Sequence, residues 1–238
     1  MNFTPALCFL LTCFSSSQGL PGQSDMQYAL AAVRDVSARE SSIRWNDHAT
    51  SRQFRQLDER IAAYSAHITT RGFIYVMTHE TSDTERFSAM QAFAPPLAKR
   101  LGSKYFLDVS EHDRSFLVRL SALWVVQVAL KKGAFSSDRL YIANRAKRLL
   151  HLSLNFDNAV IDLLQYAPRG FDAQDLGAAL RPSKYTSIAT AKVLINDGTP
   201  RAIQAMRDSI AVLRQQAATL EQMLYDRNSK GFKTPGAK

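Results

Sequence analysis

Cysteine is almost absent from this chain of 238 residues. Its two cysteines, Cys8 and Cys13, both lie close to the amino terminus. If that segment is removed during export, the remaining chain has no cysteine, which excludes disulfides, thiol nucleophiles and cysteine metal ligands. A domain of this size can be held by its hydrophobic core alone, so we expect a fold stabilised by packing.

Basic residues are absent before Arg34, although the whole chain carries a net charge of +9. The segment Met1–Gly19 contains the apolar run Ala6–Phe14 followed by small residues, and Ser17 and Gly19 suit a cleavage site. This pattern predicts a signal peptide that ends at residue 19, even without the usual positive start. We therefore expect a protein of the periplasm or one that is secreted.

Two other readings of the amino terminus stay open. Leu10–Cys13 (LLTC) is a weak match to a bacterial lipoprotein box, in which Cys13 would carry the lipid and anchor the protein. The segment would otherwise be an uncleaved anchor, or translation would start at Met26.

Beyond this segment the chain lacks an apolar run of the roughly 20 residues that a membrane span requires. The stretch Phe116–Leu130 (FLVRLSALWVVQVAL) is shorter and includes Arg119 and Gln127. Because nearly every face of it is apolar, we expect a helix in the core of the fold, surrounded by other helices. Ser110–Asp113 is expected to cap its start, and Lys131–Gly133 its end.

Motifs of catalysis and metal binding are also missing. None of the five histidines belongs to a zinc-helix pattern, and the triplet Glu111–Asp113 is better explained as the start of a helix. No serine lies in a nucleophile elbow, and the ten glycines are scattered where a phosphate loop would cluster them. We predict no catalytic residue, no metal and no cofactor. An enzyme whose site is assembled from scattered residues remains the alternative.

Amphipathic helices are what the sequence does contain. Helices are expected at about 26–43, 51–69, 139–153 and 200–225. Two of them carry a narrow apolar seam with alternating spacings of three and four residues: Phe54, Leu57, Ile61, Tyr64 and Ile68 in one, and Ile203, Met206, Ile210, Leu213, Ala217, Leu220 and Leu224 in the other. These seams predict packing in a bundle or pairing with copies in another subunit.

The expected fold is mainly α, an irregular multi-helix bundle around the buried central helix Phe116–Leu130. A small two-stranded β element, Phe73–Met77 with Tyr105–Val109, is an option because both segments are aromatic and β-branched. We expect one domain over residues 20–227 and a flexible polar tail over residues 228–238.

Two candidate binding sites follow from side-chain type. A cluster of cations, which we call the basic corner, is expected where two helices meet, and it would suit a phosphate group, an acidic partner or an anionic membrane surface; its members are Lys131, Lys132, Arg139, Arg145, Lys147 and Arg148. Trp124 is a candidate for lining a ligand pocket between helices, although its spacing also fits plain core.

The sequence therefore leads to two hypotheses of function. The first is an exported, non-enzymatic helical interaction protein of the cell envelope or extracellular space, which acts through its amphipathic helices and basic surface. It would bind a protein partner or itself, and we do not expect an exported protein to bind nucleic acid. The second is a helical carrier or sensor domain that holds an apolar or anionic small molecule near Trp124.

Overall fold

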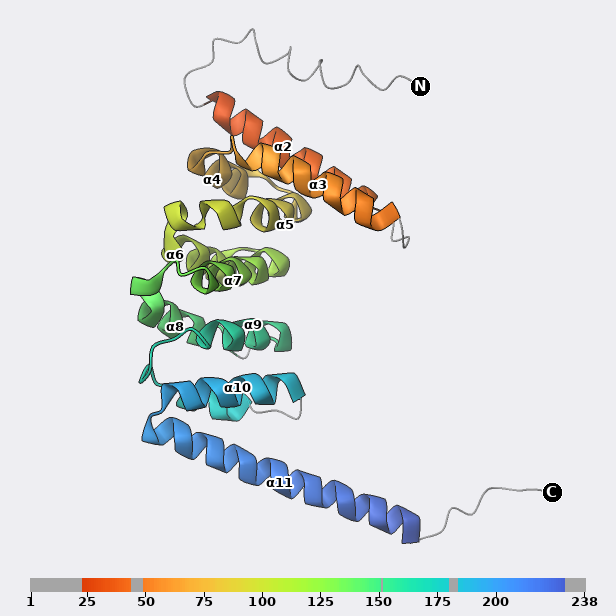
Figure 1. Cartoon of the computed structure of the whole chain (residues 1–238), viewed down its shortest axis with the longest axis vertical. Helices are drawn as coiled ribbons and strands as arrows, with labels where there is room; N and C mark the ends of the chain where they lie inside the picture. The colour runs from red at the N-terminus through yellow and green to blue at the C-terminus, as the bar shows by residue number, and fades with distance from the viewer. Residues whose placement is uncertain (1–22, 44–48, 151, 180–183, 230–238) are drawn as a thin grey trace, which may run out of the picture. The chain divides into compact units, whose positions relative to one another are not determined.

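The computed structural model describes residues 23–43, 49–150, 152–179 and 184–229. Helices account for the regular structure of these ranges, and no strand occurs within them (Figure 1). The prediction of a mainly helical, multi-helix bundle is confirmed. The predicted signal peptide, including Cys13, lies outside the described residues.

The chain divides into two compact units between Ser136 and Ser137. Each unit is described by itself below, and the single domain expected over residues 20–227 stays a prediction. With the labels of Figure 1, the first unit contains α2 (Gln23–Ser42), α3 (Ala49–Ser65), α4 (Thr70–His79), α5 (Asp83–Ala92), α6 (Ala94–His112) and α7 (Phe116–Lys131). After the short 3-10 turn η1 (Ser136–Asp138), the second unit contains α8 (Arg139–Lys147), α9 (Leu154–Leu164), η2 (Gln174–Ala179), α10 (Lys184–Asp197) and α11 (Pro200–Ser229).

Helix α7 is the predicted central helix, and it lies beside α6 in Figure 1. It packs against α5 and α6 through a face that includes Val118, Ala122, Leu123, Val125, Val126 and Leu130, all buried. The opposite side is less covered than the sequence predicts, because Phe116, Leu117 and Trp124 are exposed. The helix is therefore core on one side and surface on the other.

The expected start of α7 is wrong. Ser110, Glu111 and His112 form the last turn of α6, and Asp113 is the residue that caps its carboxyl end. Ser115 occupies the N-cap position of α7, and its backbone N–H donates to Asp113 Oδ1 at 2.8 Å. The acids thus lie at the junction of two helices, where one aspartate serves both.

The optional β element is also wrong. Phe73–Met77 lies inside α4, and Tyr105–Val109 lies inside α6. The Thr69 side chain caps α4 by accepting a hydrogen bond of 3.0 Å from the backbone N–H of Gly72. The two segments do meet, but through an edge-to-face contact of the Phe73 and Tyr105 rings, whose centroids are 6.2 Å apart.

In the second unit, α11 begins as predicted. Thr199 Oγ1 accepts a hydrogen bond of 3.1 Å from the backbone N–H of Ala202, and Pro200 takes the first helical position, where its missing N–H costs nothing. The helix continues to Ser229 and so includes Asn228 and Ser229, the first two residues of the predicted tail. The rest of that predicted tail lies outside the described residues.

In the described part of the chain, no helix is both long enough and apolar enough to cross a membrane.

Candidate functional site

The most conspicuous surface feature lies in the second half of α11. In its first turns the helix packs on η2 and α10, where Ala202 is fully buried and Ser209 Oγ donates to the carbonyl of Gly177 at 2.9 Å. Packing is close enough there that a Cβ added to Gly177 would lie 2.9 Å from the Cβ of Ala205. The amino-terminal third of α11 is thus firmly attached to its own unit.

Beyond Leu213 the same helix is uncovered. Every residue from Arg214 to Asp226 is exposed, and the apolar ones keep large exposed fractions: 60% for Leu220, 62% for Met223, 59% for Leu224 and 69% for Tyr225. Soluble proteins rarely leave so many large apolar side chains adjacent on one surface without a binding role. We call the stretch formed by Leu213, Ala217, Leu220, Met223 and Leu224 the α11 seam.

The basic corner is divided between the two units. Lys131 and Lys132 end the first unit's last helix, whereas Arg139, Arg145, Lys147 and Arg148 belong to α8 or follow it in the second unit. The side chain of Lys147 is 18% exposed, and its amine donates to the carbonyl of Asp172 and lies 3.6 Å from the Asp175 carboxylate. Its charge is therefore used within its own unit.

Arg145 also has an internal partner. Its guanidinium donates to the hydroxyl of Tyr141 at 2.8 Å and lies 5.7 Å from the centre of that ring. Among the six predicted cations, Lys131, Lys132, Arg139 and Arg148 are exposed. Anion or partner binding by the basic corner stays a prediction.

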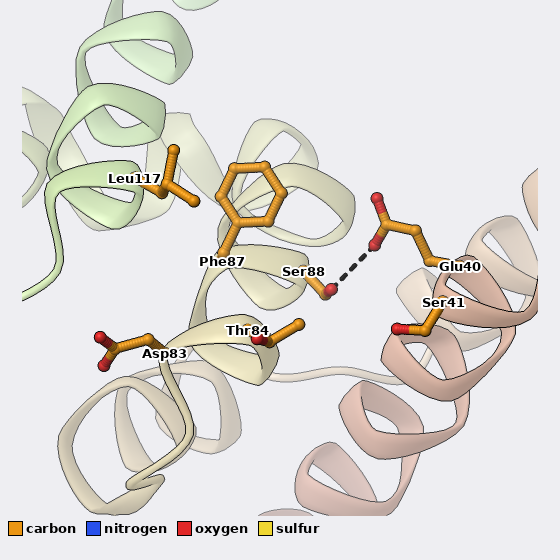
Figure 2. A pocket seen from close by; sticks show the side chains of 7 residues that line it. All are labelled: Glu40, Ser41, Asp83, Thr84, Phe87, Ser88 and Leu117. Carbon is orange, nitrogen blue, oxygen red and sulfur yellow. Dashed lines mark hydrogen bonds between the residues drawn. The ribbon is translucent and has the colours of Figure 1, made fainter.

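A hollow of about 300 Å³ opens in the first unit between α2, α5 and α7 (Figure 2). Its walls are Glu40, Ser41, Asp83, Thr84, Phe87, Ser88 and Leu117. In Figure 2, Phe87 and Leu117 form an apolar side, and the hydroxyl of Ser88 donates to Glu40 Oε2 across the hollow at 2.8 Å. This volume is at the lower end for small-molecule sites.

Trp124 does not line this hollow but lies on the same helix as Leu117. The two residues are seven positions apart, which is two helical turns, so they share one side of α7. With 39% of its surface exposed, Trp124 is accessible to a ligand. No pattern in the sequence pointed to the hollow, because its walls come from three helices that are far apart in the chain.

Two glutamates at the α4–α5 corner have opposite pKa shifts. Burial tends to raise the pKa of Glu80, but hydrogen bonds from the Ser82 backbone N–H and Glu85, together with Arg34, outweigh it and lower that pKa to about 2. Arg34 donates to the Glu80 carboxylate at 3.0 Å. Burial and the neighbouring Glu80 charge raise the pKa of Glu85. Since Glu80 caps α4 and receives the Ser82 N–H at 3.0 Å, the pair is best explained as a structural junction.

Arg86 is a buried cation in the first unit. Its guanidinium donates to Asp83 and Asp113, each at 2.9 Å, and so connects α5 to the junction of α6 and α7. We interpret the ion pair between the buried Arg86 and Asp113 as structural, because each charge compensates the other in a place shielded from water.

No group of three His, Cys, Asp or Glu side chains able to hold a metal ion occurs among the described residues. Comparison with known proteins gives no relative from which a function could be transferred: no family model, curated protein or solved structure matches the chain.

Proposed function

We propose that the chain is an exported, non-enzymatic helical interaction protein of the cell envelope or extracellular space, and that it binds another protein chain through the α11 seam. The observation that carries this proposal is the run of exposed apolar side chains from Leu220 to Tyr225 on a helix whose first turns are packed. Burying such side chains is the main driving force of protein association.

The localisation in this proposal is supported by the apolar segment before Gly19 and by the absence of cysteine after it. Apart from the α11 seam, the net charge of +9 and the exposed Lys131, Lys132, Arg139 and Arg148 support a second contact, made with an acidic ligand or an anionic surface. The contacts of these cations would weaken with salt, whereas the apolar contacts of the α11 seam would be much less affected.

Native mass spectrometry of the protein expressed with its own leader tests this proposal. We expect a mass above that of the monomer, together with loss of residues 1–19. Leu220→Glu should release the monomer, because it places a charge in the seam. Gln215→Glu adds the same charge on the opposite, exposed side of α11 and should leave the complex intact. A bare monomer from wild-type cells, or equal behaviour of the two variants, would contradict the proposal.

A second candidate function is a carrier or sensor of a small molecule, which is favoured by the hollow between α2, α5 and α7. Its Glu40 carboxylate disfavours an anion, so an apolar ligand fits better than an anionic one. Ligand should change the fluorescence of Trp124, and Leu117→Glu, which introduces a charge into the hollow wall, should abolish that change. No response to a series of uncharged apolar compounds would remove this candidate.

A further inference from the structure

We infer that the chain which covers the α11 seam is a second copy of this protein, with its α11 antiparallel to the first and the midpoint between Ala218 and Thr219. The inference rests on the proposed function, because it takes the seam to be a binding surface. It goes further by naming the occupant and its register.

The spacing of the seam is that of a coiled coil. Leu213, Ala217, Leu220 and Leu224 follow at intervals of four, three and four residues. A seam of this spacing packs against a second helix of similar spacing, with side chains of one helix between those of the other. Because α11 has 30 residues and only its first turns are packed in its own unit, several turns are available for such pairing.

Side-chain size favours the antiparallel direction. In the stated register, Leu213 faces the partner's Leu224 and Ala217 faces the partner's Leu220, and the symmetry repeats each pair. Each layer between Leu213 and Leu224 then pairs a leucine with a leucine or an alanine with a leucine, and both pairings are ordinary for a two-helix seam. A parallel, in-register pair would place Ala217 against its own copy, which leaves less apolar contact at the centre.

Charge complementarity supports the same register. Arg214 and Glu221 are exposed, flank the seam on one side, and are seven residues apart. The residues three and four positions away from Arg214 and from Glu221 are uncharged. Neither residue can therefore form an ion pair with a neighbouring turn of its own helix. In the antiparallel register each Arg214 lies beside the partner's Glu221, which gives two ion pairs. In a parallel pair, Arg214 of one copy would lie beside Ser209 of the other, and Glu221 beside Gln216. No residues of opposite charge would then meet.

The register also leaves room for η2 and α10, which pack on the first turns of each α11. Residue 208 of one helix lies beside residue 229 of the other, so the overlap covers the part of α11 beyond its packed first turns. The attachment of α11 to η2, at Ala205 and Ser209, lies at the edge of this overlap or outside it. The η2 and α10 elements of the two copies are therefore at opposite ends of the helix pair, whereas a parallel pair would bring them to the same end.

Distances between spin labels test the direction. Labels are introduced at the exposed positions Gln204 and Gln222, one position at a time, in the full chain with Cys8→Ser and Cys13→Ser. With a rise of 1.5 Å per residue, the antiparallel register separates the two copies along the helix axis by about 10 Å at position 222 and by more than about 40 Å at position 204. Similar distances at the two positions would indicate a parallel pair and overturn the inference.

Charge exchange tests the register. Arg214→Glu and Glu221→Arg should each weaken self-association in sedimentation equilibrium by on the order of tenfold, since each creates two like-charge contacts. The double variant R214E/E221R restores both ion pairs in reversed order and should bind like the wild type. Weakening that the double variant does not repair would contradict the register.

The outcomes separate this inference from the proposed function. A complex of unlike chains that Leu220→Glu disrupts would overturn the second copy as occupant but keep the α11 seam as a binding surface. A protein that stays monomeric at every accessible concentration, and that is also recovered from cells without a partner, would overturn both.

Discussion

Arg86 is a cation buried among the helices of the first unit, and its position explains why one arginine reaches from α5 to two aspartates. A buried guanidinium is tolerated only when carboxylates satisfy it, and the cost of losing one partner exceeds the gain of forming the pair. The sequence did not predict this ion pair, because Asp113 is far from Arg86 in the chain. The two side chains meet only because the turn between α6 and α7 places Asp113 beside α5.

Replacing Arg86 with methionine should lower the free energy of unfolding by about 3 to 5 kcal/mol, because it leaves Asp113 shielded from water without its cation. Arg100→Met is the matched control, since Arg100 is exposed, and we expect it to change stability by at most about 0.5 kcal/mol. Urea unfolding measures both. Equal stability of the two variants would show that the buried ion pair is not formed.

The two glutamates at the α4–α5 corner predict a dependence of stability on pH. The pKa of Glu80 is lowered from 4.5 to about 2, so the folded state favours its ionised form. The stabilisation is complete above pH 4.5 and is lost as pH falls toward 2. Glu80→Gln should therefore destabilise the protein most at neutral pH and progressively less below pH 4.5.

Glu85 provides the contrasting variant, because its pKa is raised and its ionised form is disfavoured by folding. Glu85→Gln should cost less stability at neutral pH than Glu80→Gln. Thermal unfolding followed over this pH range measures both variants. A difference between Glu80→Gln and wild type that stays constant with pH would contradict the assignment.

Among the secondary-structure elements, the long helices were easier to predict than the short segments, for which the sequence allowed either a helix or a strand. Phe116–Leu130 and the helix that begins at Pro200 were identified correctly, because long apolar periodicity and a capping residue agree there. The aromatic and β-branched residues of Phe73–Met77 were compatible with a strand. In the structure, however, Phe73, Val76 and Met77 lie on one side of a helix, since they are three and four positions apart, and all three are buried. Packing therefore decided between two local preferences that the sequence left open.

The contact between η2 and α11 depends on a residue without a side chain. Gly177→Ala should destabilise the second unit by about 1 to 3 kcal/mol, because its methyl group would overlap the Ala205 side chain. Ala205→Gly removes that methyl group, so the double variant should cost less than the sum of the single ones. A double-mutant cycle of unfolding free energies measures this coupling. Additive effects would mean that the two residues are not in contact.

At the scale of the whole molecule, the sequence predicted the seam of α11 but not which part of it is covered. Ile203 to Leu224 read as one uninterrupted stripe, whereas the structure covers its beginning with η2 and α10 and leaves the rest exposed. The hollow beside Phe87 was not predictable, since three separate helices build it. Binding surfaces of this kind depend on which elements the fold packs against one another, and these tertiary neighbours cannot be read from a single sequence.

We propose above that another protein chain covers the α11 seam. Amide hydrogen exchange, measured by mass spectrometry at high and low protein concentration, tests it most directly. We expect peptides from residues 213–226 to exchange more slowly at high concentration, and we expect Leu220→Glu to remove this protection while peptides from α7 stay unchanged. Exchange of residues 213–226 that is independent of concentration, and identical in the purified protein and in the material recovered from cells, would contradict the claim.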